Sequence, residues 1–267
     1  MSFQTIYTSG SGMLGMEQKL NTVAHNLANM ETTAFKKQRC NFEDLFYDNW
    51  RYPGSQDVQG EFTGVGIQIG LGVRVTSVQS HMRQGGFKET NRNLDVAIAG
   101  DGFFRVNDPF SGEVLYTRAG NFSVNPDGTL VLGSAHTGRL IDPPITIPED
   151  AVHVQINEDG TVWVAQGANP QLQQVGQFQL SSFINPEGLL RVGENLFQQT
   201  DASGPPTDGI PGMERMGMTK QYIIEQSNVQ PVVELIDMIT SQRAYELNSQ
   251  VTRTGDEILQ TVINIKR

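Results

Sequence analysis

Apolar side chains near the two ends of the chain recur at alternating steps of three and four residues. Near the N-terminus they are Met13, Met16, Leu20, Val23, Leu27 and Met30. Near the C-terminus they are Ala244, Leu247, Val251, Ile258 and Ile265, in the same seven-residue frame. Such spacing places one apolar stripe along one face of a helix, as in the seam of a coiled coil. We therefore predict two long terminal helices that pair as a coiled coil and then pack against further copies of the chain.

The N-terminal helix is expected to begin near Ser2 or Thr5 and to end near Met30, although three glycines weaken its first half. The C-terminal helix is expected over 229–265, with Asn228 as a plausible N-cap. A helix of that length is a rod of roughly 55 Å, far longer than the average globular helix. A long helix that begins weakly needs packing partners to be stable.

Between these ends the sequence has the texture of strands and turns. Two similar segments, NPDGTL at 125–130 and NEDGTV at 157–162, place Asp-Gly between alternating apolar runs and predict two hairpins of one sheet system. The fold class is therefore α+β, with a β-rich central domain. We divide the chain into paired terminal helices (1–47 and 226–267), a glycine-rich extended segment (48–72) and a β-rich domain (73–225).

The acidic charge of the chain is concentrated in its middle. The total is −10, of which residues 1–60 and 220–267 each carry −1, so −8 falls between them. Nearly neutral helical ends can approach like copies without strong repulsion, whereas a nucleic-acid partner would require a basic face. The sequence predicts a self-associating protein with an acidic β domain and no nucleic-acid partner.

Catalytic and cofactor signals are weak along the whole chain. The four histidines do not pair with one another or with Cys40 at metal-ligand spacing, and there is no phosphate-binding loop. Cys40 is the single cysteine, so no intrachain disulfide is possible. The first residues lack the basic start and apolar run of a Sec signal peptide, and no apolar stretch is long enough to span a membrane. We expect no enzyme activity, no cofactor and no metal.

Several motifs distributed along the chain resemble those of the bacterial flagellar rod and hook proteins. Near the N-terminus AHNLAN at 24–29 precedes TAFKK at 33–37, and near the C-terminus stands VVELIDMITSQRAYE at 232–246. The central motif is LDVAIAGDGFF at 94–104. The motif residues that we single out are Asn26, Asn29, Phe35, Lys36, Gln242, Arg243 and Tyr245.

Segments 42–47, 51–56 and 66–73 are most similar to the distal-rod members of this family, with proximal-rod members of similar length as the alternative. In the extended segment we single out Arg51, Pro53 and Gly54. Two positions depart from the family pattern. Ala34 stands where glycine is common, so the turn after the first helix is expected to be more helical here. His25 replaces a common asparagine, which leaves its hydrogen bonding open.

The resemblance implies a structural subunit of the flagellar distal rod, the helical drive shaft that carries motor torque across the periplasm to the hook. It implies export by the flagellar type III apparatus without a Sec signal. The partners would be further copies of the chain, proximal rod proteins and hook protein at the ends, and P- and L-ring proteins around the shaft. The terminal helices would line the inner tube, the extended segment would contact neighbouring subunits, and the β domain would lie outside.

Two other functional classes remain open from the residues alone. One is a β-domain enzyme such as a glycan hydrolase, which would need two carboxylates in one cleft, and no sequence feature nominates them. The other is a glycan- or surface-binding module that uses exposed aromatic side chains such as Trp163 and Phe110. Core packing is the simpler role for those two aromatic residues.

Overall fold

The computed structural model describes residues 2–54, 56, 62, 64–109, 112–133, 138–167, 171–213 and 216–265. The chain divides into two compact units, which we describe separately. The helical unit comprises residues 1–28, 38–80 and 230–267, and the β unit comprises residues 29–37 and 81–229. Both units are thus assembled from segments far apart in the sequence.

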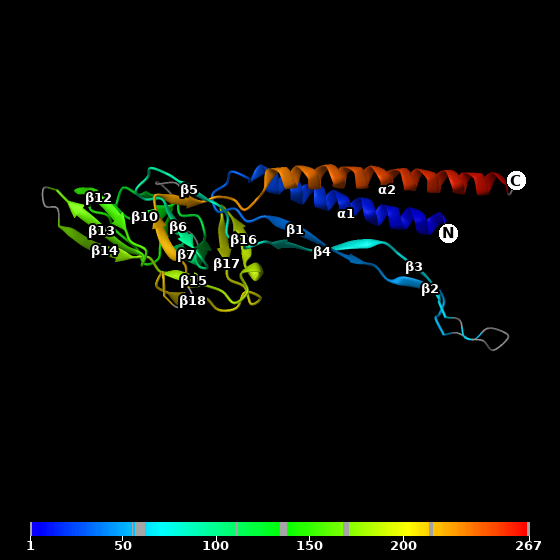
Figure 1. Ribbon diagram of the computed structural model, residues 1–267, viewed down its shortest axis with the longest axis horizontal. Coiled ribbons are helices and arrows are strands. Elements are labelled where there is room, and N and C mark those ends of the chain that lie inside the picture. The colour runs from blue at the N-terminus through cyan, green and yellow to red at the C-terminus, as the bar shows by residue number, and fades with distance from the viewer. Residues whose placement is uncertain are drawn as a thin grey trace. The chain divides into compact units, whose positions relative to one another are not determined.

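The helical unit contains two long helices and two antiparallel strand pairs (Figure 1). The helices are α1 (Ser2–Ala28) and α2 (Pro231–Ile265), and they run alongside each other. Strand β1 (Gln38–Asp44) pairs with β4 (Val73–Ser80), and this ribbon packs on α1. Strands β2 (Tyr47–Arg51) and β3 (Ile67–Gly70) form a separate hairpin. The prediction of two terminal helices is confirmed.

Three local details differ from the sequence-based expectations. Residues 38–44 form a strand rather than part of the helical ends, because their backbone pairs with β4. Asn228 does not cap α2, which begins at Pro231, because its side chain bonds instead to backbone groups of other segments. The turn after α1 is not helical at Ala34, which has a φ of 57° in the left-handed region.

The β unit is a set of antiparallel sheets. A nine-stranded sheet has the order β16-β17-β8-β7-β11-β10-β9, with β15 pairing to β7 and to β18. A three-stranded sheet is formed by β12, β13 and β14, and two further pairs are β6–β19 and β5–β20. The strands of this unit are β5 (Phe87–Glu89), β6 (Val96–Ala99), β7 (Phe103–Asn107), β8 (Val114–Thr117), β9 (Phe122–Val124), β10 (Leu130–Leu132), β11 (Arg139–Ile141), β12 (Ala151–Ile156), β13 (Thr161–Gln166), β14 (Leu172–Gln177), β15 (Leu180–Ser182), β16 (Leu190–Gly193), β17 (Leu196–Gln198), β18 (Thr207–Gly209), β19 (Met218–Gln221) and β20 (Ile223–Glu225).

The two repeated Asp-Gly segments form hairpins with the same turn, as predicted. In the first, the amide of Asn125 donates to the carbonyl of Thr129 at 3.0 Å; in the second, Asn157 donates to Thr161 at 3.0 Å. The glycine of each turn has a positive φ, 79° at Gly128 and 77° at Gly160, which glycine adopts without steric cost. The prediction that both hairpins belong to one sheet system is wrong, because β9–β10 belong to the nine-stranded sheet and β12–β13 pair in a separate three-stranded sheet.

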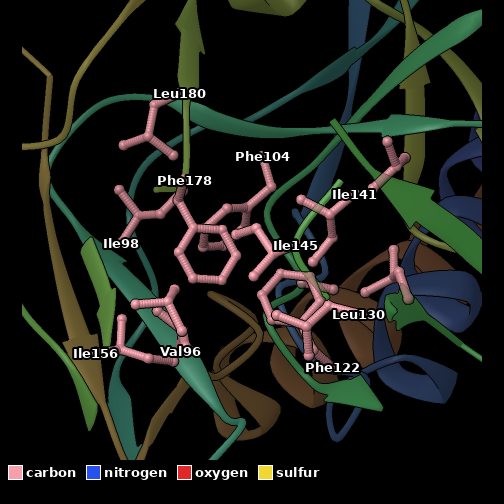
Figure 2. Packing of buried hydrophobic residues seen from close by; sticks show 14 of the residues in the cluster. Val96, Ile98, Phe104, Phe122, Leu130, Ile141, Ile145, Ile156, Phe178 and Leu180 are labelled. Carbon is pink, nitrogen blue, oxygen red and sulfur yellow. The ribbon is translucent and has the colours of Figure 1, made fainter. Parts of the chain in front are cut away.

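The core of the β unit is built from aliphatic and aromatic side chains of these sheets (Figure 2). Phe104 meets Phe122 edge to face with ring centroids 5.1 Å apart, and Phe122 stacks on Phe178 at 5.6 Å. Such aromatic pairs add to the free energy of area burial. A smaller cluster forms around Phe103. The β unit therefore has its own hydrophobic core.

Candidate assembly surfaces and the residues that position them

Helices α1 and α2 meet through small and polar side chains. The hydroxyls of Ser9 and Thr252 lie 2.9 Å apart. A Cβ at Gly12 would lie 3.0 Å from the Asn248 side-chain nitrogen, and a Cβ at Gly255 would lie 3.1 Å from Ile6. Low residue numbers of α1 thus face high numbers of α2, so the helices are antiparallel. The glycines that weaken α1 and α2 as isolated helices permit this close approach.

The close contacts that α2 makes with α1 have heptad spacing, and the α2 residues that make them are small or polar. Ser241 is buried, and the side chain or Cβ position of each of Asn248, Thr252 and Gly255 lies against α1. The apolar stripe predicted from the sequence contains Ala244, Val251 and Ile258, which come three residues after Ser241, Asn248 and Gly255. Three residues along a helix place the stripe about 60° around the helix axis from that contact face. The stripe members Leu247, Val251, Ile258 and Ile265 are therefore more exposed than the face that contains Ser241 and Gly255, and packing through this stripe stays a prediction.

Asn26 joins three segments of the helical unit at the end of α1. Its amide nitrogen donates to the Gln38 carbonyl at 2.8 Å, and its side-chain oxygen accepts from the Gln38 amide at 2.8 Å. The same nitrogen donates to a carboxylate oxygen of Glu234 at 3.1 Å. Both Asn26 and Glu234 are fully buried. The asparagine side chain thus substitutes for a strand partner of Gln38 and fixes the first turn of α2.

Strand β4 is held on α1 by a glycine and a serine. The Ser11 hydroxyl accepts a hydrogen bond from the Val73 amide at 3.2 Å. A Cβ at Gly72, whose φ is 116°, would lie 2.1 Å from that hydroxyl oxygen. No other residue type fits this position without displacing the strand from the helix.

The predicted packing residues lie at very different degrees of exposure. On α1, Val23 is buried and Met13, Met16, Leu20 and Leu27 are half-buried. Met30 is 41% exposed and lies beyond the end of α1. On α2, Ala244 is half-buried, and the exposed members are Leu247 (61%), Val251 (43%), Ile258 (53%) and Ile265 (79%).

Apolar side chains are instead concentrated on the outer faces of the two helices. Phe3, Tyr7 and Leu14 are exposed on α1. The additional exposed apolar residues of α2 are Val232, Val233, Leu235, Ile236, Ile239, Val262 and Ile263. Exposed apolar surface of this extent marks an interaction site. Most of the close contacts between the helices are therefore made by small and polar groups, with Ile6 as an apolar exception, and many large apolar groups lie outside.

The β2–β3 hairpin is a second exposed apolar surface of the helical unit. Its large exposed side chains, with those of the flanking residues, are Phe46, Tyr47, Trp50, Tyr52, Phe62, Val65 and Ile67. Arg51 pairs with Ile67, and Gly54 has a φ of 82°. Of the predicted extended segment, residues 55, 57–61 and 63 lie outside the described part of the chain. An isolated two-stranded hairpin is marginal in water and needs a surface to cover it.

In the β unit, three buried charged side chains connect its N-terminal segment to its last strand. The Lys36 ammonium lies 2.6 Å from one carboxylate oxygen of Glu225, and the Arg118 Nε lies 2.9 Å from the other. Lys36 also donates to the Arg83 carbonyl, and Arg118 donates to the carbonyls of Gly102 and Gly100. Every charge is therefore both paired and hydrogen-bonded, as burial requires.

The environment of this cluster shifts two pKa values. Burial lowers the pKa of Lys36 from its ordinary 10.5, and the charge of Glu225 only partly opposes that effect. Burial alone would raise the pKa of Glu225, but the charges of Arg118 and Lys36 outweigh it and hold the pKa below 4.5. The carboxylate is therefore ionised at neutral pH.

The low pKa of Glu225 makes the stability of the β unit sensitive to acid. Its contribution is fully present above the unfolded pKa near 4.5 and is lost as the pH falls through the lower folded value. We expect the free energy of unfolding to fall less in Glu225→Gln than in the unsubstituted protein between about pH 6 and about pH 3. Urea unfolding at both pH values measures the difference. Glu43→Gln, at an exposed carboxylate of the helical unit, is the control and should behave like the unsubstituted chain. If the free energy of unfolding fell equally with pH in Glu225→Gln and in the unsubstituted chain, Glu225 would not be the acid-sensitive group.

Neighbouring residues fasten the same N-terminal segment to the β unit. The Ala34 amide donates to the Glu225 carbonyl at 2.8 Å, and Ala34 lies in the core cluster. The Arg191 guanidinium lies 5.5 Å from the centre of the Phe35 ring. The Asn228 side chain accepts from the Lys37 amide at 2.7 Å and donates to backbone carbonyls at His81 and Arg83. Residues 34–37 are thus an integral part of the β unit.

Three family models match the chain in order along its length. The first, described as "Flagella basal body rod protein", covers residues 6–36, and the second, the "Flagellar hook protein FlgE/F/G D1 domain", covers residues 97–164. The third, the "Flagellar basal body rod FlgEFG protein C-terminal", covers residues 220–265. Lys36 therefore lies in the N-terminal match and its partner Glu225 in the C-terminal one.

Full-length relatives show the same similarity. A protein of Caulobacter vibrioides named flagellar basal-body rod protein FlgG is 42% identical over 264 residues, 98% of this chain and 99% of the relative. Proteins of the same name in Borreliella burgdorferi and Bacillus subtilis are 38% and 36% identical, each over 99% of both chains. The chain belongs to the flagellar basal-body rod protein family. Members of this family are structural proteins and not enzymes.

The rod-family motif residues divide between buried positions near the end of α1 and exposed positions on α2. Asn26, Phe35 and Lys36 are buried, and Asn29 begins the turn after α1 by accepting from the Thr32 amide at 3.2 Å. On α2, Gln242, Arg243 and Tyr245 are exposed. Arg243 pairs with Glu246 at 2.9 Å on the helix surface.

Of the two aromatic residues considered for a binding module, only Trp163 lies in the described part of the chain. Trp163 is half-buried, and its ring nitrogen donates to the Thr161 hydroxyl at 3.0 Å; Phe110 lies outside the described residues. Within the described ranges, no three His, Cys, Asp or Glu side chains are grouped so that they could hold a metal ion. No helix in the described part of the chain has both the length and the apolar character to cross a bilayer.

Sequence analysis did not identify the Lys36–Glu225–Arg118 cluster or the polar face between the helices. Lys36 and Glu225 are 189 positions apart, and nothing in the pattern around either one indicates the other. The polar face could have been suspected from the sequence, because the small or polar residues Ser241, Asn248 and Gly255 recur every seven residues.

Proposed function

We propose that the chain polymerises helically into the distal part of the flagellar rod and transmits motor torque across the periplasm to the hook. The observation that carries this proposal is the distribution of side chains on the helical unit. Large apolar side chains are exposed on the outer faces of α1 and α2, whereas most of the close contacts between the helices are made by small and polar groups. Further copies of the chain, packing against those outer faces, would remove this apolar surface from water.

The proposal assigns different roles to the parts of the chain. The terminal helices pair, in coiled-coil fashion, as the inner tube. Their stripe residues, from Met13 to Met30 and from Ala244 to Ile265, pack within the helical unit where they are buried, as at Val23, and between subunits where they are exposed, as at Val251. The exposed aromatic residues of the β2–β3 hairpin support an intersubunit role for segment 48–72. The β domain, with its own core and most of the acidic charge, lies outside and faces the P- and L-ring proteins. Proximal rod proteins and hook protein cap the two ends.

The polar contacts between α1 and α2 also predict the state of the single subunit. We expect amides of 5–25 and 235–262 in dilute monomer to exchange rapidly with solvent, because small polar contacts provide little apolar burial to offset backbone ordering. Residues 34–36 should be protected in the same sample, because they are fixed in the β unit. Hydrogen exchange measured by mass spectrometry on monomer and on assembled rods makes the comparison. Strong protection of both helices in the monomer would contradict the prediction.

Isolation of rods from motile cells tests the function itself. The gene is replaced by a copy with a small C-terminal tag, and hook–basal bodies are purified and imaged. We expect tag-directed gold in the rod segment next to the hook, and rods that end early when the gene is deleted. Labelling elsewhere, or complete rods without the gene, would overturn the proposed function.

A further inference from the structure

The helical unit has an open hollow where the start of α1 lies beside α2. It has a volume of about 430 Å³ and is lined by Thr5, Leu247, Gln250, Val251, Thr254, Gly255 and Ile258. Leu247, Val251 and Ile258 provide apolar surface, while Gln250 and Thr254 provide an amide and a hydroxyl. None of the lining side chains carries a charge. The hollow therefore suits a side chain with an apolar body and an uncharged polar tip.

The start of α1 bears a side chain of this kind, but in the same copy it points away from the hollow. Thr5 lines the hollow, whereas Tyr7 is 63% exposed and Phe3 is 78% exposed. Two residues along a helix correspond to a rotation of about 200°. Tyr7 and Phe3 therefore both lie on the face of α1 opposite Thr5, and they cannot enter the hollow of their own copy.

We propose that the hollow of one copy receives Tyr7 of a second copy, with Phe3 packing one turn before it. This inference rests on the proposed function, because it names the contact through which copies join. The ring of Tyr7 packs on Val251 and its apolar neighbours, and the phenol hydroxyl reaches the Gln250 amide or the Thr254 hydroxyl.

The charge pattern of the chain favours a second copy as the occupant. The first sixteen residues carry no charged side chain, so this face of α1 can enter an uncharged hollow without desolvating an ion. The donor and acceptor surfaces lie on different faces of the helical unit, so the contact is head-to-tail. Head-to-tail contacts that do not close into a ring generate open filaments.

Disulfide trapping tests this contact directly, because Cys40 is the only cysteine of the chain. The test chain carries Cys40→Ser, Tyr7→Cys and Thr254→Cys and replaces the native gene in motile cells. Mild oxidation of isolated rods is expected to give a ladder of cross-linked multimers on denaturing gels. The matched control places the first cysteine at Leu14, also exposed on α1, and is expected to give no ladder. Rods that assemble but yield no ladder from the Tyr7 pair would overturn the inference and leave the proposed function intact.

If the introduced cysteines themselves prevent assembly, a pair of opposite charges placed at Tyr7 and Val251 tests the same contact. Tyr7→Lys and Val251→Glu are each expected to reduce the number of rods per cell by about tenfold or more, because each places an unpaired charge in the contact. The double variant is expected to recover most rods, because lysine then meets glutamate in every contact. A double variant no better than the single variants would overturn the inference. Cells that build normal rods without any copy of this chain would instead overturn the proposed function.

Discussion

Replacing Val251 with aspartate is expected to abolish rod assembly while the β unit remains folded. Val251 lies on the exposed apolar face of α2, where aspartate is well solvated in the free chain. In a rod the same position would be buried between copies, and burying an unpaired carboxylate costs several kcal/mol at every subunit. Swimming in soft agar and electron microscopy of isolated basal bodies measure the effect.

The matched control is Gln260→Asp, which adds the same charge at an exposed position of α2 nine residues away and about 180° around the helix. Rods and motility should survive this change much better than Val251→Asp. Circular dichroism of both purified variants should show the same β-unit unfolding transition as the unsubstituted protein. Normal motility of the Val251→Asp strain would show that this face of α2 does not pack between copies.

Replacing Lys36 with methionine is expected to lower the free energy of unfolding of the β unit by about 3–5 kcal/mol, because it leaves Glu225 buried with one cation fewer. Methionine retains most of the side-chain volume, so the loss comes from the charge and not from a cavity. Urea unfolding followed by tryptophan fluorescence measures it through Trp163 in β13, in a background where the exposed Trp50 is phenylalanine.

Arg92→Met is the control for that measurement. The Arg92 side chain is 62% exposed and its nearest ion pair, with Asp95, spans 3.9 Å. Asp95 is buried, but it keeps its hydrogen bond from the Thr90 hydroxyl, and the Arg92 charge lies in water, so we expect Arg92→Met to change the free energy of unfolding by only about 1 kcal/mol. If Lys36→Met behaved like Arg92→Met, the buried cluster would not stabilise the β unit.

The helices and hairpins could be predicted from the sequence because their signals are local. A seven-residue period identifies α1 and α2, and Asp-Gly between apolar runs identifies the turns at Gly128 and Gly160. The phase of the helix pairing could not be predicted in the same way, because an apolar stripe indicates that a face is buried without indicating what covers it. In an isolated globular helix the cover is the protein's own core. In this chain the exposed stripe of α2 is available to other copies.

The long-range polar contacts were beyond sequence reasoning for a different reason. Asn26 and Glu234, like Lys36 and Glu225, come from opposite ends of the chain, and each pair is meaningful only once both ends are folded. The sequence does single out Asn26 and Lys36 through the rod-family motif, but it gives no reason for them. The structure supplies one: Asn26 joins α1, β1 and α2, and Lys36 fixes the adjoining segment in the β unit.

Electron cryomicroscopy of isolated rods is the most direct test of the central claim that the outer faces of the terminal helices join copies of this chain. The account predicts a helical array of this chain in the distal rod, in which Leu247, Val251 and Ile258 of each copy are buried against another copy. A rod in which these three side chains remain in contact with water would contradict it.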